Sequence, residues 1–420
     1  MSYLEICGGV PLSGRLQVQG AKNSVLPILA AALLAPGQSI LHNCPWLSDV
    51  EATGKILRLL GCPVTREGDT LLVDASQPTG CVIPDWLMRE MRSSVIFLGA
   101  MLSRLGRAEL SYPGGCELGP RPIDLHLGAL RSLGAEIVEE QGHLRCTVGS
   151  GLVGRELCLS IPSVGATENA MLAACGARGV TTIVGAAREP EIVDLQAFLN
   201  AMGGRVSGAG SPVVTVEGEA PLHPAEHTVI GDRIAAATYL CAVGTAGGRL
   251  ELEGVEPPSL AAVTACLQEA GCILRTGSRR LDLKSRGQLR GVRPVRTAPY
   301  PGFPTDAQAV LMAALAGGTG TTMFVENMFD NRYRHVDELA RMGADIQLAG
   351  RVAVVTGRPL HGAQVRSTDL RGGAALVVAA LAAEGVSQVS GLEHIRRGYE
   401  GLEVQLSALG GKIQLHTEET

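Results

Sequence analysis

Apolar, alanine-rich runs recur along the chain at intervals of roughly 70 residues. Six of them are visible, beginning near Gly20, Met91, Gly165, Gly231, Pro304 and Ser367. Each run is apolar around most of the circumference of a helix, a pattern typical of a helix buried on all sides. The chain is therefore predicted to contain six repeats, each opening with a buried helix.

A β-type stretch follows each buried helix, and a second helix with one polar face comes next. These second helices end at a glycine, the residue that best adopts the left-handed conformation after a helix C-terminus. The six glycines are Gly61, Gly134, Gly203, Gly271, Gly343 and Gly410. Short β-rich stretches such as residues 135–148 and 204–218 close the repeats, so each repeat is predicted as helix, strand, helix and strand pair.

Polar residues near the start of each buried helix predict where it begins. Candidate N-caps are Asn23, Thr167, Asp232, Thr368 or Asp369, and Thr305, which has capping-box spacing to Gln308. Free N–H groups and partial positive charge at several helix starts favour an anionic ligand when the starts point at one place. Simple packing of the helices explains the same pattern, so both interpretations stay open from the residues alone.

A length of 420 residues exceeds what one hydrophobic core usually supports, so two domains of three repeats each are expected. The formal net charge of -5 and the aromatic content of 3% argue against a nucleic-acid-binding surface. The longest apolar run, residues 24–35, is shorter than the roughly 18 residues of a membrane span, and no signal-peptide pattern is present. We therefore expect a cytoplasmic protein without membrane insertion.

The 11 cysteines are an odd number without CxxC or Cys/His ligand spacing, so neither a disulfide framework nor a metal site is expected. Cys116 stands apart, because Gly114, Gly115 and Gly119 surround it in SYPGGCELGPRPIDLH, a composition that indicates a mobile lid. Cationic neighbours would lower the pKa of its thiol and make it reactive, although an isolated cysteine is also common as a small buried residue.

Charged side chains gather at the predicted helix starts and in the adjoining loops. They are Lys22, Arg92, Arg233, Asp306, Arg332, Asp369, Arg371 and Arg397. One such residue alone would be interpreted as a solvated charge or a surface ion pair, but recurrence in several repeats favours a shared anion-binding site. Asp306 is a candidate general base, although a carboxylate in the first turn also stabilises a helix dipole.

Nine segments, in order, match motifs of one known family. They are GAKNSVLPILAAALL, REMRSSVIFLGAML, YPGGCELGPRPIDLH, PSVGATENAMLAA, AAREPEIVDL, RTAPYPGFPTDAQA, FDNRYRHVDELARMGA, STDLRGGAALVVAAL and HIRRGYEGLEVQLSALG. Through them the chain resembles, over essentially its full length, the UDP-N-acetylglucosamine enolpyruvyl transferases of the EPSP synthase-like superfamily.

The resemblance implies an α/β fold of two inside-out α/β barrel domains with the active site in the interdomain cleft. It also implies that the first strand joins the C-terminal domain. We therefore expect an N-terminal domain of residues 21–229, carrying the Cys116 loop, and a C-terminal domain of residues 1–20 and 230–420. Closure of the domains on the ligands is expected, with a monomer or weak homo-oligomer as the functional form.

The implied activity is that of a UDP-N-acetylglucosamine 1-carboxyvinyltransferase, which acts on two small-molecule substrates. The sugar 3-hydroxyl attacks the central carbon of phosphoenolpyruvate while the methylene is protonated, and the tetrahedral intermediate then expels phosphate. This is the first committed step of peptidoglycan precursor synthesis, and the resemblance implies that no cofactor or metal takes part.

The resemblance also assigns substrate contacts. Phosphoenolpyruvate is expected at Lys22, Asn23, Arg92, Arg121 and Arg397. UDP-N-acetylglucosamine is expected at Asn23, Arg92, Arg121, Pro122, Ile123, Asp124, Leu125, Ser163, Val164, Gly165, Asp306 and Met328.

The same resemblance implies catalytic roles. Asp306 would accept the hydroxyl proton, while Cys116 would handle the methylene proton, assist release and be alkylated by the epoxide fosfomycin. Lys22 and Arg397 would stabilise charge. The supporting residues would be Arg332, Asp369 and Arg371.

Four positions depart from the family's common pattern. Ala235 and Asp330 stand where Glu is frequent, Ile161 replaces a Lys found in some members, and Tyr300 replaces a frequent His. The acid, base and anion-binding positions match.

Three alternatives compete with this hypothesis. An enolpyruvyl transferase acting on shikimate 3-phosphate would share the repeats and the anion pocket, but the Cys116 loop favours the nucleotide-sugar enzyme. A catalytically dead paralogue would be expected to have lost Lys22, Cys116, Asp306 or Arg397, which are all present. A purely structural repeat protein needs neither a reactive thiol nor converging charges.

Overall fold

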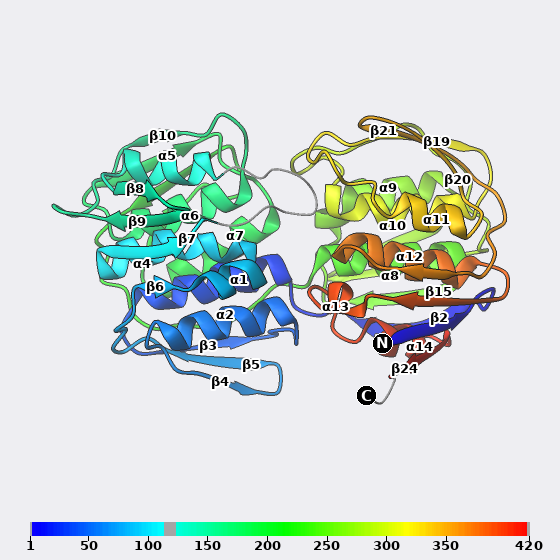
Figure 1. Ribbon diagram of the computed structural model, residues 1–420, viewed down its shortest axis with the longest axis horizontal. Coiled ribbons are helices and arrows are strands. Elements are labelled where there is room, and N and C mark those ends of the chain that lie inside the picture. Colours follow the sequence, from blue (N-terminus) through cyan, green and yellow to red (C-terminus); the bar gives the residue numbers. More distant parts are fainter. Residues whose placement is uncertain (1, 113–122, 418–420) are drawn as a thin grey trace. The chain divides into compact units, whose positions relative to one another are not determined.

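The computed structural model describes residues 2–112 and 123–417 (Figure 1). Their contacts divide them into two compact units. The 20–230 unit contains residues 20–112 and 123–230, and the 231–417 unit contains residues 231–417 together with the N-terminal residues 2–19. Each unit is described by itself below.

The 20–230 unit contains three repeats. Its helices are α1 (Lys22–Ala31), η1 (Ala32–Leu34), α2 (Ser48–Leu59), α3 (Asp85–Glu90), η2 (Arg92–Ile96), α4 (Phe97–Leu105), α5 (Asp124–Ser132), α6 (Val164–Cys175) and α7 (Pro190–Ala201). Its strands are β3 (Gln38–His42), β4 (Val64–Glu67), β5 (Thr70–Asp74), β6 (Val82–Ile83), β7 (Arg107–Ser111), β8 (Glu136–Glu140), β9 (His143–Thr147), β10 (Glu156–Cys158), β11 (Val180–Val184), β12 (Arg205–Ser207), β13 (Val213–Glu217) and β14 (Glu226–Thr228).

The 231–417 unit contains the other three repeats and the first two strands of the chain. Its helices are α8 (Arg233–Ala246), η3 (Pro257–Leu260), α9 (Ala261–Glu269), α10 (Thr305–Ala316), α11 (Val336–Arg341), α12 (Leu370–Ala382), α13 (Leu392–Ile395) and α14 (Leu402–Ala408). Its strands are β1 (Tyr3–Cys7), β2 (Leu12–Gln17), β15 (Gly248–Glu253), β16 (Ile273–Gly277), β17 (Arg280–Ser285), β18 (Val295–Arg296), β19 (Thr321–Val325), β20 (Asp345–Ala349), β21 (Val352–Thr356), β22 (Gln364–Arg366), β23 (Val386–Ser390) and β24 (Lys412–His416).

Among the described residues the strands form six four-stranded sheets, one for each repeat. In each sheet one edge strand pairs parallel to the strand that follows the buried helix, and the remaining pairings are antiparallel. The strand pair predicted for each repeat is present in the first five repeats, whereas in the sixth β24 pairs with the N-terminal strand β1. The parallel edge strand was not predicted, because it is as short as two residues in β6 and β18 and such segments carry no period-two pattern.

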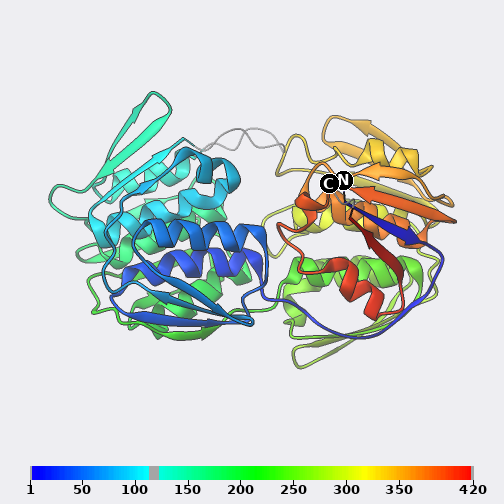
Figure 2. The same cartoon turned by 60° about the horizontal axis from the view of Figure 1, so that its bottom comes forward.

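Long-range strand pairing completes three of the sheets. Strand β1 lies antiparallel between β23 and β24, with Leu4 opposite Val389 and Leu415. Figure 2 shows this N-terminal strand, in blue, beside the red C-terminal strand. Strand β2 pairs parallel with β15, and β14 pairs parallel with β3. Each unit is thus closed by strands from distant parts of the chain.

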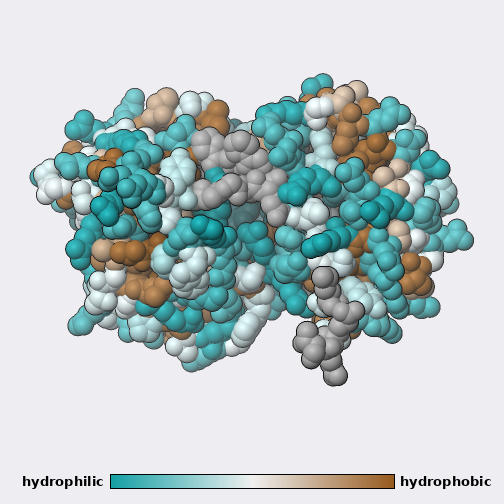
Figure 3. Space-filling model, viewed as in Figure 1, coloured by the Kyte–Doolittle hydropathy of each residue, from teal (hydrophilic) through white to brown (hydrophobic). Residues whose placement is uncertain are grey.

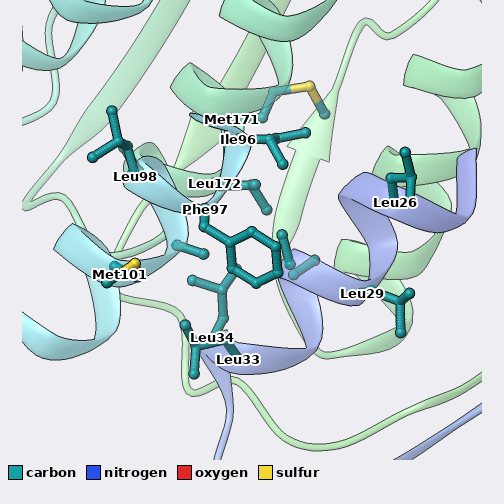
Figure 4. Packing of buried hydrophobic residues seen from close by; sticks show 14 of the residues in the cluster. Leu26, Leu29, Leu33, Leu34, Ile96, Phe97, Leu98, Met101, Met171 and Leu172 are labelled. Carbon is teal, nitrogen blue, oxygen red and sulfur yellow. The ribbon is translucent and has the colours of Figure 1, made fainter. Parts of the chain in front are cut away.

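The first helix of each repeat is buried within its unit. Helices α8, α10 and α12 contact one another and lie side by side in Figure 1, and α4 likewise packs on α1 and α6. Phe97 of α4 is fully buried among apolar side chains of α1, η1 and α6 in Figure 4. Burying a side chain of this size stabilises the fold by about 1.5–3 kcal/mol. Each unit has its own core, which includes the residues of the apolar runs.

All six glycines predicted to end the second helices have the left-handed conformation, with φ from +86° at Gly61 to +112° at Gly271. A side chain there would be strained, so glycine ends each helix at a defined place. Together with the helix and strand order, this confirms the predicted α/β fold of two inside-out barrels built from six repeats.

The predicted N-caps were only partly right. The carboxylates of Asp232 and Asp369 accept hydrogen bonds from the first backbone N–H groups of α8 and α12, as predicted. Asn23, Thr167 and Thr305 lie inside their helices, so these three predictions are wrong. The Thr167 hydroxyl instead binds the backbone of Ser163 and Ala187, and that of Thr305 binds the Glu326 carboxylate, because tertiary partners compete with the helix end for these groups.

Hydrophilic residues predominate on the face shown in Figure 3, where hydrophobic residues form scattered groups. None of the helices within 2–112 and 123–417 is both long and apolar enough to cross a membrane.

Candidate active site

The start of α1 holds the first cluster of predicted site residues in the 20–230 unit. The Nζ atom of Lys22 lies 2.6 Å from Oδ2 of Asp49 on α2, and both side chains are nearly buried. The N–H of Ala21 donates to the carbonyl of Ile230 at 2.7 Å, which fixes the backbone just before the helix. Asn23 is half-buried beside Lys22. The ammonium group of Lys22 is thus held at a helix start, where partial positive charge adds to its own.

A second cluster lies where α6 begins. The Ser163 hydroxyl accepts a hydrogen bond from the N–H of Ala166 and caps the helix, with Val164 and Gly165 in its first turn. The ring of His126, on α5, packs on Gly165 so closely that a Cβ atom there would lie 2.8 Å from the ring. Glycine at this helix start therefore lets the His126 ring contact the beginning of α6.

The His126 ring is fixed by Asn169 of α6. Asn169 accepts a hydrogen bond from the N–H of Gly99 at 2.7 Å, so its amide nitrogen faces His126 Nδ1 at 2.8 Å. Nδ1 must then accept, which leaves the proton of the neutral ring on Nε2. Burial lowers the pKa of His126 to about 4, while Asp124 opposes this shift and Arg92 reinforces it. His126 and Asn169 were not predicted as site residues, because their roles depend on contacts between repeats.

The remaining described residues predicted for this unit are Ile123, Asp124 and Leu125, which directly precede His126 in the chain, and Arg92, whose charge acts on the pKa of His126. Ile123 is the buried N-cap of α5, and Asp124 and Leu125 form the first turn of that helix. Arg92 begins η2 and is half-buried. Cys116, Arg121 and Pro122 lie outside the described residues.

In the 231–417 unit, Asp306 binds two arginines. Arg332 donates to Oδ1 of Asp306 at 2.6 Å, and Arg371 donates to Oδ2 at 3.3 Å. The side chains of Arg332 and Arg371 are 2% and 4% exposed, whereas that of Asp306 is 29% exposed. The carboxylate is therefore oriented by buried cations and still reaches solvent, as a general base must.

Asp369 and His335 lie beside these arginines. One carboxylate oxygen of Asp369 caps α12, accepting from the N–H groups of Arg371 and Gly372 at 3.0 and 2.9 Å. This cap fixes the backbone from which Arg371 reaches Asp306. Burial lowers the pKa of His335 to about 4, while Asp369 opposes this shift and Arg332 reinforces it. His335 is a further residue that sequence reasoning missed.

Arg397 lies in a turn whose following backbone is held by hydrogen bonds to Gln19. The Gln19 amide donates to the carbonyl of Gly398 at 3.1 Å and accepts from the N–H of Glu400 at 2.8 Å. Between them, the buried Tyr399 shares a 2.8 Å hydrogen bond with the hydroxyl of Thr238 on α8. The half-buried Arg397 is thus presented by a well-anchored backbone.

Met328 follows β19 in a loop that is tied to the start of α10. Its N–H donates to the carboxylate of the buried Glu326 at 2.7 Å, and the Thr305 hydroxyl donates to the other oxygen at 3.0 Å. The described residues hold no group of three or more His, Cys, Asp and Glu side chains placed to bind a metal ion.

The structure therefore groups the predicted residues in sets within each unit. The 20–230 unit gathers Lys22 with Asn23, and the 163–165 turn with His126. The 231–417 unit gathers Asp306 with Arg332, Arg371 and Asp369, and places Arg397 in an anchored turn. Cationic side chains and helix starts suit anionic ligands, and the half-exposed carboxylate suits proton transfer.

Comparison with known proteins agrees with this chemistry. A sequence model of the EPSP synthase (3-phosphoshikimate 1-carboxyvinyltransferase) family matches residues 6–406. The chain therefore belongs to this family of enolpyruvyl transferases. Among solved structures, the enolpyruvyl transferase NikO from Streptomyces tendae is similar with a TM-score of 0.89 and 27% identity, covering 100% of this chain and 99% of that one. EPSP synthase from Acinetobacter baumannii, at 20% identity and a TM-score of 0.77, covers 99% of this chain and 100% of its own and shares the fold.

Relatives at higher identity narrow the assignment within the family. UDP-N-acetylglucosamine 1-carboxyvinyltransferase 2 of Caldanaerobacter subterraneus subsp. tengcongensis is 48% identical over 414 residues, covering 98% of this chain and 99% of that protein. UDP-N-acetylglucosamine 1-carboxyvinyltransferase of Shewanella amazonensis is 43% identical over 416 residues, covering 98% and 99%. Within the EPSP synthase family, the chain thus groups with the UDP-N-acetylglucosamine 1-carboxyvinyltransferases, as its motifs predicted.

Proposed function

We propose that this chain transfers the enolpyruvyl group of phosphoenolpyruvate to the 3-hydroxyl of UDP-N-acetylglucosamine and releases phosphate. The oxygen of the hydroxyl forms a bond to the central carbon of phosphoenolpyruvate, and the methylene takes up a proton. Loss of that proton and breakage of the bond to the phosphate oxygen then give the enol ether. The reaction is the first committed step of peptidoglycan precursor synthesis.

The observation that carries the proposal is the Asp306 carboxylate, held by two buried arginines yet partly exposed. A base that accepts a hydroxyl proton must be oriented and within reach of the substrate. Arg332 and Arg371 supply the orientation, and Asp369 supports Arg371 through the α12 cap. We assign Asp306 as the acceptor of the sugar hydroxyl proton.

Cationic groups are assigned to phosphoenolpyruvate, whose phosphate and carboxylate need several positive partners. They are Lys22, Arg92, Arg121 and Arg397, with Asn23 beside Lys22. Lys22 and Arg397 would also stabilise charge that develops in the intermediate. Cys116 is assigned to the methylene proton and to release.

The nucleotide sugar is assigned to the remaining residues. They are Asn23, Arg92, Arg121, Pro122, Ile123, Asp124, Leu125, Ser163, Val164, Gly165, Asp306 and Met328. The capped start of α6 favours the diphosphate, because free N–H groups and the helix dipole attract anions.

The same proposal includes the predicted domains, 21–229 and 1–20 with 230–420. A cytoplasmic location and a monomeric or weakly associated form remain predictions from the sequence. Shikimate 3-phosphate is the alternative acceptor, since it is the substrate class named for the family as a whole. The identities of 43% and 48% to nucleotide-sugar enzymes favour UDP-N-acetylglucosamine.

The test mixes the purified protein with phosphoenolpyruvate and either UDP-N-acetylglucosamine or shikimate 3-phosphate, and follows phosphate and product mass. Phosphate together with enolpyruvyl-UDP-N-acetylglucosamine in the first mixture alone supports the proposal. Activity only with shikimate 3-phosphate would move the protein to the other acceptor. No phosphate and no product in either mixture would indicate a protein that has lost catalytic activity.

A further inference from the structure

A buried carboxylate with no assigned role lies next to the proposed base. Glu326 follows β19 and is 0% exposed. Its Oε1 accepts hydrogen bonds from the Thr297 hydroxyl at 3.0 Å and from the N–H groups of Met328 and Phe329 at 2.7 and 3.2 Å. Its Oε2 accepts from the Thr305 hydroxyl at 3.0 Å.

Four donors directed at one carboxylate explain how this group can be buried. A carboxylate removed from water is costly unless hydrogen bonds replace its hydration. Two of the donors are backbone N–H groups, which no rotation of a side chain can redirect. The backbone N–H groups of Met328 and Phe329 stabilise the Glu326 carboxylate, and Glu326 in turn fixes the position of that backbone.

The donors come from three separate segments, and two of these segments carry proposed site residues. Thr305 is the first residue of α10 and immediately precedes Asp306. Its carbonyl also accepts from Arg332 at 3.1 Å, and Arg332 in turn binds Asp306. The loop of Met328 is held through its own N–H and through Asn327, whose N–H donates to the Thr297 hydroxyl at 2.8 Å.

We propose that Glu326 is a positioning residue for the acceptor sugar nucleotide. Glu326 joins the start of α10, which carries Asp306, to the loop of Met328. It thereby fixes the distance between the proposed base, Asp306, and Met328, which is assigned to the sugar nucleotide. This inference rests on the proposed function and adds a residue that acts through Thr305, Met328 and Phe329. A group that only stabilised the fold would affect unfolding and leave the kinetics of the folded enzyme unchanged.

The test compares Glu326→Ala with Glu326→Gln. In Glu326→Gln the amide oxygen keeps the three donors on Oε1, and the amide nitrogen donates to the Thr305 hydroxyl, which can rotate to accept. In Glu326→Ala the two N–H groups lose their acceptor. The matched control is Glu269→Ala, which removes a partly exposed carboxylate that also accepts a backbone N–H, that of Arg293 at 2.7 Å.

For Glu326→Ala we expect KM for UDP-N-acetylglucosamine to rise about tenfold or more and kcat to fall, because two buried N–H groups are left unsatisfied and the loop relaxes. KM for phosphoenolpyruvate should change by less than about threefold, since none of the described hydrogen-bond partners of Glu326 is assigned to that ligand. Glu326→Gln should recover most of the loss, and Glu269→Ala should match the wild type.

Unchanged kinetics in a folded Glu326→Ala enzyme would overturn the inference, as would equal increases in both KM values. If Glu326→Ala does not fold, Thr305→Val replaces it, because it removes one donor while keeping the shape of the side chain. A KM for UDP-N-acetylglucosamine within about 1.5-fold of wild type in Thr305→Val would then count against the role. A wild-type enzyme inactive toward UDP-N-acetylglucosamine would instead overturn the proposed function itself.

Discussion

Arg332 donates a 2.6 Å hydrogen bond to Asp306 from a side chain that is 2% exposed, although the two residues are 26 positions apart in the chain. A guanidinium group stays charged when buried, so it can fix the direction of the carboxylate without competing for its proton. The second carboxylate oxygen is bound by Arg371. The carboxylate that we propose as the proton acceptor is thus held in place by two buried cations.

Replacing Asp306 by asparagine should remove the base and keep the shape of the site. We expect kcat to fall by about 100-fold or more, the usual contribution of a positioned general base. Phosphate release at saturating substrate measures this, and Asp282→Asn, which alters a partly exposed carboxylate paired with Arg280, is the control. A loss of less than about threefold would exclude Asp306 as the base.

Asp49→Ala should destabilise the 20–230 unit, because it leaves the nearly buried ammonium group of Lys22 without the carboxylate that lies 2.6 Å away. Removing one partner of a nearly buried pair should cost more than about 1 kcal/mol. Urea unfolding followed by circular dichroism tests this expectation. Asp85→Ala breaks an exposed pair with Arg89 and should cost at most about 1 kcal/mol. Equal effects of the two substitutions would contradict the expected burial of the Lys22 pair.

His126 should make the stability of its unit depend on pH. Its pKa of about 4 in the folded protein lies below the ordinary 6.5, so the unfolded chain takes up the proton first. The stability that comes from a neutral ring is complete above about pH 6.5 and is lost as the pH falls toward 4. Between pH 7.5 and pH 5 the loss amounts to about 2 kcal/mol.

Urea unfolding of wild type and His126→Asn at these two pH values isolates this contribution. Asparagine keeps an acceptor for Asn169 but does not titrate, so the variant should lose less stability than the wild type on acidification. His143→Asn changes an exposed histidine of the same unit and should keep the wild-type dependence. The same loss on acidification in wild type and His126→Asn would show that His126 does not carry the effect.

Gln19→Ala should weaken phosphoenolpyruvate binding through the Arg397 turn. The substitution removes both hydrogen bonds that the Gln19 amide makes to the backbone at Gly398 and Glu400. If the full loss of two hydrogen bonds, about 1 kcal/mol each, weakens binding, KM for phosphoenolpyruvate should rise by up to about 30-fold. Steady-state kinetics test it, with Gln414→Ala on the exposed side of β24 as the control. An unchanged KM would mean that the turn holds Arg397 without Gln19.

Local sequence was sufficient for most of the fold. The six apolar runs became the buried helices, and the six glycines after the second helices have positive φ, because both features depend on residues close together in the chain. The motifs also led to the family that comparison supports. The N-cap predictions for Thr167 and Thr305 failed because their hydroxyls have partners outside their own helices, and that for Asn23 failed because it is the second residue of α1.

The sequence by itself determined the repeats, the two cores and the residue types available for chemistry, since these follow from local periodicity and short motifs. Only the tertiary structure decided that β1 lies between β23 and β24, that Arg332 and Arg371 bind the same carboxylate, and that Asn169 fixes the tautomer of His126. These relationships join residues up to several hundred positions apart. They arise when separate repeats pack together, and no local pattern encodes which side chains then meet.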